Sequence, residues 1–175
     1  MDYEKLLKKC KRKPLLDIAQ ESVVKVTIGK EGLYKILPNR EPFIFLDGIS
    51  GIDLENRAVV GHRYISSADP VFGGHFPGNP IYPGVLQLEM ISELFCCLYY
   101  FVSQNSVEVS DNGPVQLRAT RMHDAILQHP VLPETTVTII TQVLELTPYT
   151  YTGIGQLMTG EKVAIAVVGE FYIVE

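Results

Sequence analysis

The sequence contains no tryptophan and only three cysteines among its 175 residues. Cys10 stands alone, whereas Cys96 and Cys97 are adjacent and would point in different directions on a helix. Neither a disulfide framework nor a zinc-binding spacing is therefore present. The first residues also lack the apolar segment and the small-residue cleavage site of a secretion signal. These absences predict a protein of a reducing, cytoplasmic compartment.

The chain also lacks an excess of positive charge, because its formal net charge is -5. This balance gives no electrostatic reason to expect nucleic acid as a partner. A local exception is the basic cluster from Lys8 to Lys13. Such a run is usually a solvated chain end, and the alternative is a surface for an acidic partner.

A membrane span is not expected, although residues 85–102 form a long apolar run. The run contains Glu89 and Glu93, which are costly at a bilayer centre, so it predicts a buried core helix without membrane insertion. The chain is long enough for one sizeable core and too short for two. We expect an N-terminal extension over residues 1–33 and a single domain over residues 34–175.

The predicted elements follow the hydrophobic pattern along the chain. Segments 43–53 and 57–65 are rich in β-branched and aromatic residues and predict a hairpin, and apolar residues at three- and four-residue steps predict the helix over 85–102. This order predicts an α+β fold in which an antiparallel sheet wraps around a single helix. The remaining predicted strands cover residues 115–122, 135–146, 150–158 and 163–174.

A loop rich in glycine and proline, residues 72–84, precedes the helix and contains His75. Glu89 lies in the second helical turn. Eliminating water from a β-hydroxyacyl thioester needs a base for the α-proton, an acid for the hydroxyl and donors for the thioester oxygen. His75 can be the base, Glu89 can act on the hydroxyl, and the N–H of Gly84 at the helix start can face the oxygen.

Structural roles are the alternative for the same residues. A histidine in such a loop is usually held for structure, and a glutamate near a helix start usually interacts with the helix dipole. The apolar neighbours of Glu89 favour the catalytic interpretation, because a carboxylate there needs a partner or a raised pKa. Glu93 is predicted to be structural or solvent-facing. No cysteine or second histidine accompanies the pair, so we expect neither a metal nor another cofactor.

Residues 74–86, Gly-His-Phe-Pro-Gly-Asn-Pro-Ile-Tyr-Pro-Gly-Val-Leu, together with Glu89 closely resemble the signature of the bacterial (3R)-hydroxyacyl-acyl-carrier-protein dehydratases, the FabZ/FabA-like hot-dog family. Residues 37–47 are similar to the opening motif of that family, and residues 131–134 to a later one. The resemblance implies a curved sheet around one long helix, with two protomers joined edge to edge as a homodimer and often a trimer of dimers.

The resemblance also implies roles for individual residues. His75 is the catalytic histidine, Glu89 is the acid supplied by the neighbouring protomer, and Gly84 provides the thioester donor. The relatives that also isomerise their product mostly carry aspartate at the position of Glu89, so plain dehydration to a trans-2-enoyl thioester is expected. The other implied substrate-binding positions are Ile81, whose carbonyl orients the histidine, and Phe76, Pro83 and Val85.

The expected partner is an acyl carrier protein that bears the substrate in fatty acid or polyketide-like biosynthesis. The chain departs from the family at Asn39 and Glu41, and a basic pair thought to meet the carrier is replaced by Gln128 and His129. Such departures suggest a specialised dehydratase. They also leave three alternatives for carrier docking, which are Arg118, Arg121 or the cluster from Lys8 to Lys13.

Two other functions stay open from the sequence. A hot-dog thioesterase would activate water in place of an α-proton, but those enzymes generally lack the His-Phe-Pro-Gly segment. A non-catalytic subunit that binds carrier protein would need neither titratable side chain, whereas His75 and Glu89 are both present.

Overall fold

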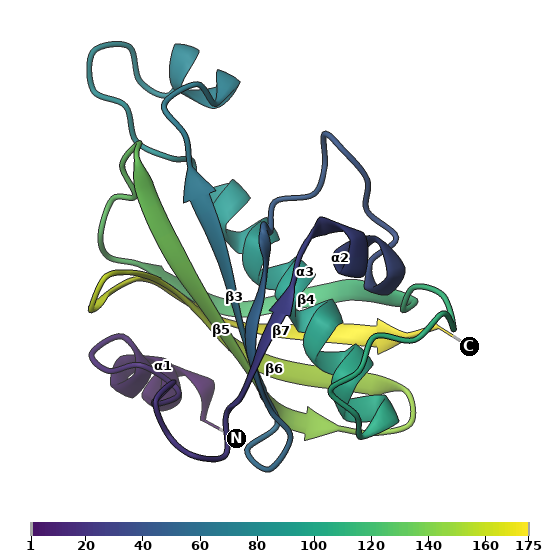
Figure 1. The fold of residues 1–175 in the computed structure, drawn as a ribbon. Coiled ribbons are helices and arrows are strands. Elements are labelled where there is room, and N and C mark those ends of the chain that lie inside the picture. Colours follow the sequence, from purple (N-terminus) through teal and green to yellow (C-terminus); the bar gives the residue numbers. More distant parts are fainter. Residues whose placement is uncertain (1, 175) are drawn as a thin grey trace.

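Helix α3 (Gly84–Gln104) forms the axis of the fold, and an antiparallel sheet curves around it (Figure 1). The structure, a computed structural model, describes residues 2–174. Its seven strands lie in the order β1-β2-β3-β5-β6-β7-β4, and this arrangement confirms the predicted α+β hot-dog fold. The strands are β1 (Val24–Ile28), β2 (Gly48–Asp53), β3 (Ala58–Ile65), β4 (Leu117–Leu127), β5 (Thr135–Leu146), β6 (Thr150–Thr159) and β7 (Lys162–Ile173).

Close contact with the sheet explains why α3 is apolar on most of its surface. A Cβ atom added to Gly153 or Gly155 of β6 would lie 2.5 Å from the Phe95 ring or 2.2 Å from an Ile91 methyl group. Larger residues at these two positions would therefore push the helix away from the sheet. By length and composition α3 could also cross a membrane, but more than half of its most apolar stretch is buried inside the protein.

The N-terminal segment covers the outer face of the same sheet. Helix α1 (Tyr3–Cys10) and the chain after it bury apolar side chains against this face, which forms a second cluster separate from the core around α3. The fully buried amide of Gln156 accepts a hydrogen bond from the N–H of Leu15 at 2.8 Å and donates one to the carbonyl of Lys13 at 2.8 Å. The predicted boundary at residue 34 stays a prediction, although β1 lies before it in the same sheet.

Several element boundaries differ from those predicted. The first hairpin strand begins at Gly48 and not at residue 43, because the N–H groups of Phe45 and Leu46 bind a side chain of α3 and no neighbouring strand. The strand predicted over 115–122 runs on to Leu127. Helices α1 and α2 (Lys30–Ile36) and the 3-10 helix η1 (Pro70–Gly73) were not predicted, since each has at most eight residues and such short helices depend on tertiary packing.

Strand β4 forms one edge of the sheet. Among residues 2–174 it pairs only with β7, so its outer row of backbone groups is open. Met122 and Leu127 of this strand are exposed although both are apolar. An open edge with apolar side chains is suited to pairing with another chain.

Candidate active site

The loop that carries His75 is closed by its own backbone. The His75 N–H donates to the carbonyl of Val71 at 2.9 Å, and the His75 carbonyl accepts from the N–H of Ile81 at 3.1 Å. The next residue, Tyr82, donates to the carbonyl of Val131 at 2.8 Å and so attaches the loop to the segment before β5. These bonds fix the histidine backbone immediately before α3 begins.

A side-chain contact determines the tautomer of His75. Its Nδ1 atom lies 2.7 Å from the carbonyl oxygen of Ile81. A carbonyl can only accept, so Nδ1 carries the hydrogen and donates it. The Nε2 atom of the neutral ring therefore keeps a free lone pair, as a general base requires. The ring also stacks on Phe76, with their centroids 4.0 Å apart.

His75 and Gly84 lie on the wall of one open pocket of about 320 Å³. A Cβ atom at position 84 would fall 2.3 Å from a methyl group of Leu127, so glycine allows the helix start to approach β4. The first N–H groups of a helix have no intrahelical acceptor and can bind a developing negative charge. The complete lining consists of His75, Ile81, Tyr82, Gly84, Gln87, Leu127, Gln128, His129 and Pro130.

This lining differs in part from the expected substrate-binding set. Ile81 and Gly84 belong to it, whereas Phe76, Pro83 and Val85 do not, and Val85 is 72% exposed. Sequence reasoning did not identify Gln87 as part of the pocket. The sequence signal for Gln87 was a polar residue three positions after Gly84 on an otherwise apolar helix. In the structure, the Gln87 side-chain amide donates to the carbonyl of Tyr82 at 3.1 Å.

Glu89 does not line the pocket of His75 in this chain. The carboxyl group is partly buried, and burial raises its pKa. Within residues 2–174, no hydrogen bond or ion pair of the Glu89 carboxyl group offsets this rise in pKa. The two predicted catalytic residues are therefore near in sequence, but a single chain does not bring them to one pocket.

Glu93 is buried. Of the two predicted alternatives, this position agrees with a structural role and excludes a solvent-facing side chain. Its carboxylate accepts the N–H of Phe45 at 2.9 Å, the N–H of Leu46 at 3.1 Å and the side-chain amide of Asn39 at 3.4 Å. Burial raises the pKa of Glu93 to about 7, while the bonds from Phe45 and Leu46 act in the opposite direction. The segment before β2 is thereby attached to α3.

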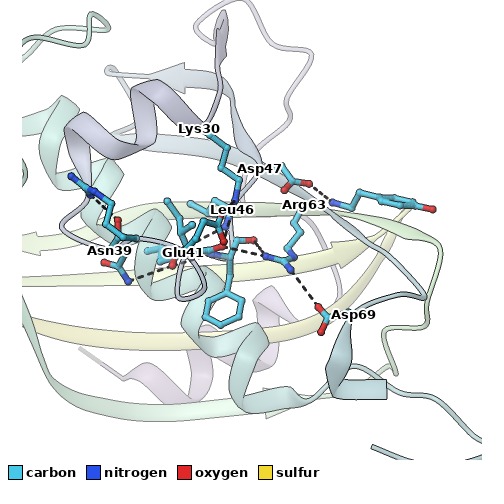
Figure 2. A network of polar contacts seen from close by, with 12 residues as sticks. Lys30, Asn39, Glu41, Leu46, Asp47, Arg63 and Asp69 are labelled. Atoms are coloured by element: carbon cyan, nitrogen blue, oxygen red, sulfur yellow. Dashed lines mark hydrogen bonds and ion pairs between the residues drawn. The ribbon is translucent and has the colours of Figure 1, made fainter. Parts of the chain in front are cut away.

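Arg63 on β3 extends this connection toward the histidine loop (Figure 2). Its guanidinium donates to the carbonyl of Phe45 at 2.8 Å and pairs with Asp69 at 3.4 Å. Asp69 in turn accepts from the N–H of Val71 at 3.1 Å and caps η1, the short helix before His75. A continuous set of polar contacts thus links α3 to the loop that holds the histidine.

Within residues 2–174, no group of three or more histidine, cysteine, aspartate or glutamate side chains is placed to hold a metal ion.

Two positions that depart from the family motif have polar partners in the structure. Asn39 contacts Glu93 as described above, and Glu41 forms an ion pair with Lys30 at 3.0 Å.

Comparison with known proteins identifies the family. The model of the FabA-like domain matches residues 37–166, about three quarters of the chain. A 3-hydroxyacyl-[acyl-carrier-protein] dehydratase FabZ from Chlamydia trachomatis serovar L2 is 38% identical over 81 residues, 46% of this chain and 53% of that protein. A FabZ of the same description from Sulfurimonas denitrificans is 48% identical over 61 residues, 35% of this chain and 40% of that protein. The chain thus spans about half the length of the curated relatives that it matches.

Solved structures share the fold at low sequence identity. The dehydratase heterocomplex ApeI:P from Xenorhabdus doucetiae matches with a TM-score of 0.63 and 14% identity, over 82% of this chain and 91% of that chain. A mutant of the thioesterase PA1618 from Pseudomonas aeruginosa matches with a TM-score of 0.53 and 11% identity, over 74% and 81% of the two chains. At such identities the likeness concerns the fold alone.

The raised pKa of Glu93 predicts a pH-dependent stability. In the unfolded chain this group loses its proton near its ordinary pKa of 4.5, whereas the folded protein holds the proton up to about pH 7. The free energy of unfolding should therefore fall as the pH rises from about 4.5 to 7, by about 3 kcal/mol from this group. Glu93→Gln is uncharged throughout and should lack this component of the fall.

Urea unfolding at pH 5 and pH 8 measures the difference in stability between the wild type and Glu93→Gln. Glu145→Gln, at an exposed position of β5, serves as the control and should follow the wild type at both values. If the difference in the free energy of unfolding between the wild type and Glu93→Gln is the same at both pH values, the raised pKa of Glu93 is contradicted.

Proposed function

Since the chain belongs to the FabA-like domain family, we propose that it is a 3-hydroxyacyl-[acyl-carrier-protein] dehydratase that converts a β-hydroxyacyl thioester into a trans-2-enoyl thioester. The observation that carries the proposal is the 2.7 Å contact between His75 Nδ1 and the Ile81 carbonyl, which leaves Nε2 free as a base. This base lines the same pocket as Gly84 at the start of α3, where a thioester oxygen can be bound.

Three groups share the reaction. His75 Nε2 removes a proton from C2, and the negative charge that develops on the thioester oxygen is stabilised by the Gly84 N–H. The C3–O bond breaks as Glu89 donates a proton to the hydroxyl, so water leaves and a double bond forms between C2 and C3. Burial raises the Glu89 pKa, which increases the fraction of this group that can donate a proton near neutral pH.

The complete site needs a second copy of the chain. Glu89 is absent from the pocket lining of its own chain, and three apolar side chains are exposed near that pocket. Leu127, at the end of the open edge β4, is 57% exposed, and Phe76 and Val85 are exposed beside the loop and the helix start. Pairing of two β4 edges would cover these side chains and supply Glu89 from the partner. The wider trimer of dimers stays a prediction.

A role in fatty acid or polyketide-like synthesis follows from the proposed substrate, and the departures at Asn39 and Glu41 favour a specialised pathway. Hydrolysis of the same thioester is less well supported. The likeness to a thioesterase is one of fold at 11% identity, whereas a histidine with a free Nε2 beside a helix start is suited to removal of an α-proton.

Substitution of either proposed catalytic side chain should abolish most of the activity. His75→Ala removes the base and Glu89→Gln removes the acid, so each should lower enoyl formation from a β-hydroxybutyryl thioester by about two to four orders of magnitude. Both variants should keep the wild-type far-ultraviolet circular dichroism spectrum, because neither substitution removes a large packing volume. Glu145→Gln is the matched control and should stay fully active; near-normal turnover in folded His75→Ala or Glu89→Gln would refute the assignment.

Mixed dimers test whether the site is shared between two chains. In a dimer of one His75→Ala chain and one Glu89→Gln chain, one site contains both intact residues and the other contains neither. Random pairing after joint refolding of equal amounts makes about half of the dimers mixed, so roughly a quarter of the wild-type activity should return. If dimers form in the mixture and no activity returns, the two residues belong to one chain.

A further inference from the structure

The charge of the chain is distributed very unevenly. Residues 1–13 hold six basic and two acidic side chains, a net charge of +4, whereas the rest of the chain holds nine basic and eighteen acidic side chains, a net charge of -9. An acidic protein would thus be repelled by most of this molecule and attracted to its N-terminal segment. Such attraction matters for the proposed reaction only if that segment is held close to the active site.

Two glutamine side chains hold the segment in place. Gln128 lines the pocket of His75, and its amide also donates to the backbone carbonyl of Lys11 at 2.9 Å. Gln156 binds the backbone at Leu15 and Lys13 from the middle of the sheet, and it also donates to the Cys10 carbonyl. The basic segment is thereby attached to a residue of the pocket wall.

The charged groups of several side chains in this segment are available to a partner. Lys9, Arg12 and Lys13 are exposed, and within residues 2–174 none of these three side chains forms an ion pair. Lys8 differs, because it pairs with Glu4 one helical turn earlier. Lys11 is partly buried, and its backbone carbonyl carries the bond from Gln128.

The other basic residues considered for docking lie farther from the pocket of their own chain. Arg118 and Arg121 belong to β4, whose opposite end reaches the pocket at Leu127. At about 3.3 Å per residue, Arg118 is about 30 Å and Arg121 about 20 Å along the strand from Leu127. The same strand forms the edge at which two protomers are proposed to pair. The N-terminal segment is therefore the better placed of the two basic surfaces.

We propose that Lys9, Lys11, Arg12 and Lys13, called here the basic tract, form the docking surface for the acidic protein that carries the acyl thioester. The inference rests on the proposed function and adds the surface by which the substrate is delivered. Gln128 and Gln156 position the tract, so the N-terminal extension takes the place of a basic pair beside the pocket. Binding through such exposed charges should weaken as the salt concentration rises.

Charge reversal tests the surface directly. Arg12→Glu should raise the KM for a β-hydroxybutyryl carrier protein several-fold, and Lys9→Glu with Arg12→Glu should raise it at least about tenfold, with kcat unchanged. Neither variant should alter the kinetics on the N-acetylcysteamine thioester of the same acyl group, which has no carrier to dock. Lys25→Glu resembles Arg12→Glu in charge change but lies on β1, at the other edge of the sheet, and should behave as the wild type.

A second variant separates position from charge. Gln156→Leu retains every charge but removes three bonds to the backbone of residues 10–15, so it should also raise the carrier KM several-fold. Its turnover of the small thioester should stay unchanged, and hydrogen exchange of residues 10–15 should be faster than in the wild type. Faster exchange with an unchanged carrier KM would overturn the positioning role of Gln156.

Failure of this inference can be distinguished from failure of the proposed function. Anisotropy of a fluorescently labelled acidic acyl carrier protein measures its binding to the full-length chain without any turnover, and the double variant should bind at least about tenfold more weakly at low salt. Equal binding by the wild type and the double variant would overturn the docking surface even if dehydration occurs. Absence of dehydration with both substrates would refute the proposed function alone.

Discussion

The buried carboxylate of Glu93 is the contact on which the arrangement of the site depends. It lies within α3 and accepts two backbone N–H groups from Phe45 and Leu46, in a region where no strand pairing satisfies them. Unpaired buried N–H groups are costly, so this segment needs the carboxyl oxygens of Glu93 as acceptors. Arg63 then connects the segment to Asp69 and to the start of η1, which leads to His75. The base is thus held by α3 through contacts outside the pocket.

Hydrophobic periodicity was sufficient to predict the central parts of the fold. The helix from Gly84 and the strands β5 and β7 follow the sequence pattern within one or two residues, because each is a long run rich in apolar residues and the two strands are also rich in β-branched ones. The pattern failed at residues 43–47, because the N–H groups of Phe45 and Leu46 bond to the Glu93 side chain, 47 or more residues away, and to no neighbouring strand. It also did not show how the extension packs, because that depends on Gln156, a polar residue in a strand.

The site was predictable where its residues are close in sequence. His75, Gly84 and Glu89 all belong to one junction between loop and helix, so their chemistry could be inferred from spacing and from a family signature. The opposite wall of the pocket could not be inferred, because Gln128 and His129 are distant in sequence from His75. They line the pocket only because β4, which ends directly before them, runs toward it. Local sequence also does not show that Glu89 lies outside the His75 pocket of its own chain, since that depends on which faces of α3 the sheet covers.

Removal of water from a β-hydroxyacyl thioester is the activity claimed for this chain. The most direct measurement incubates the purified protein with a β-hydroxybutyryl thioester and follows two products, the absorbance of the conjugated enoyl thioester and the free thiol. We expect enoyl absorbance without release of thiol. Release of thiol without enoyl absorbance would identify a thioesterase, and the absence of both products with small and carrier-bound substrates would show a protein without this catalytic activity; either result would contradict the claim.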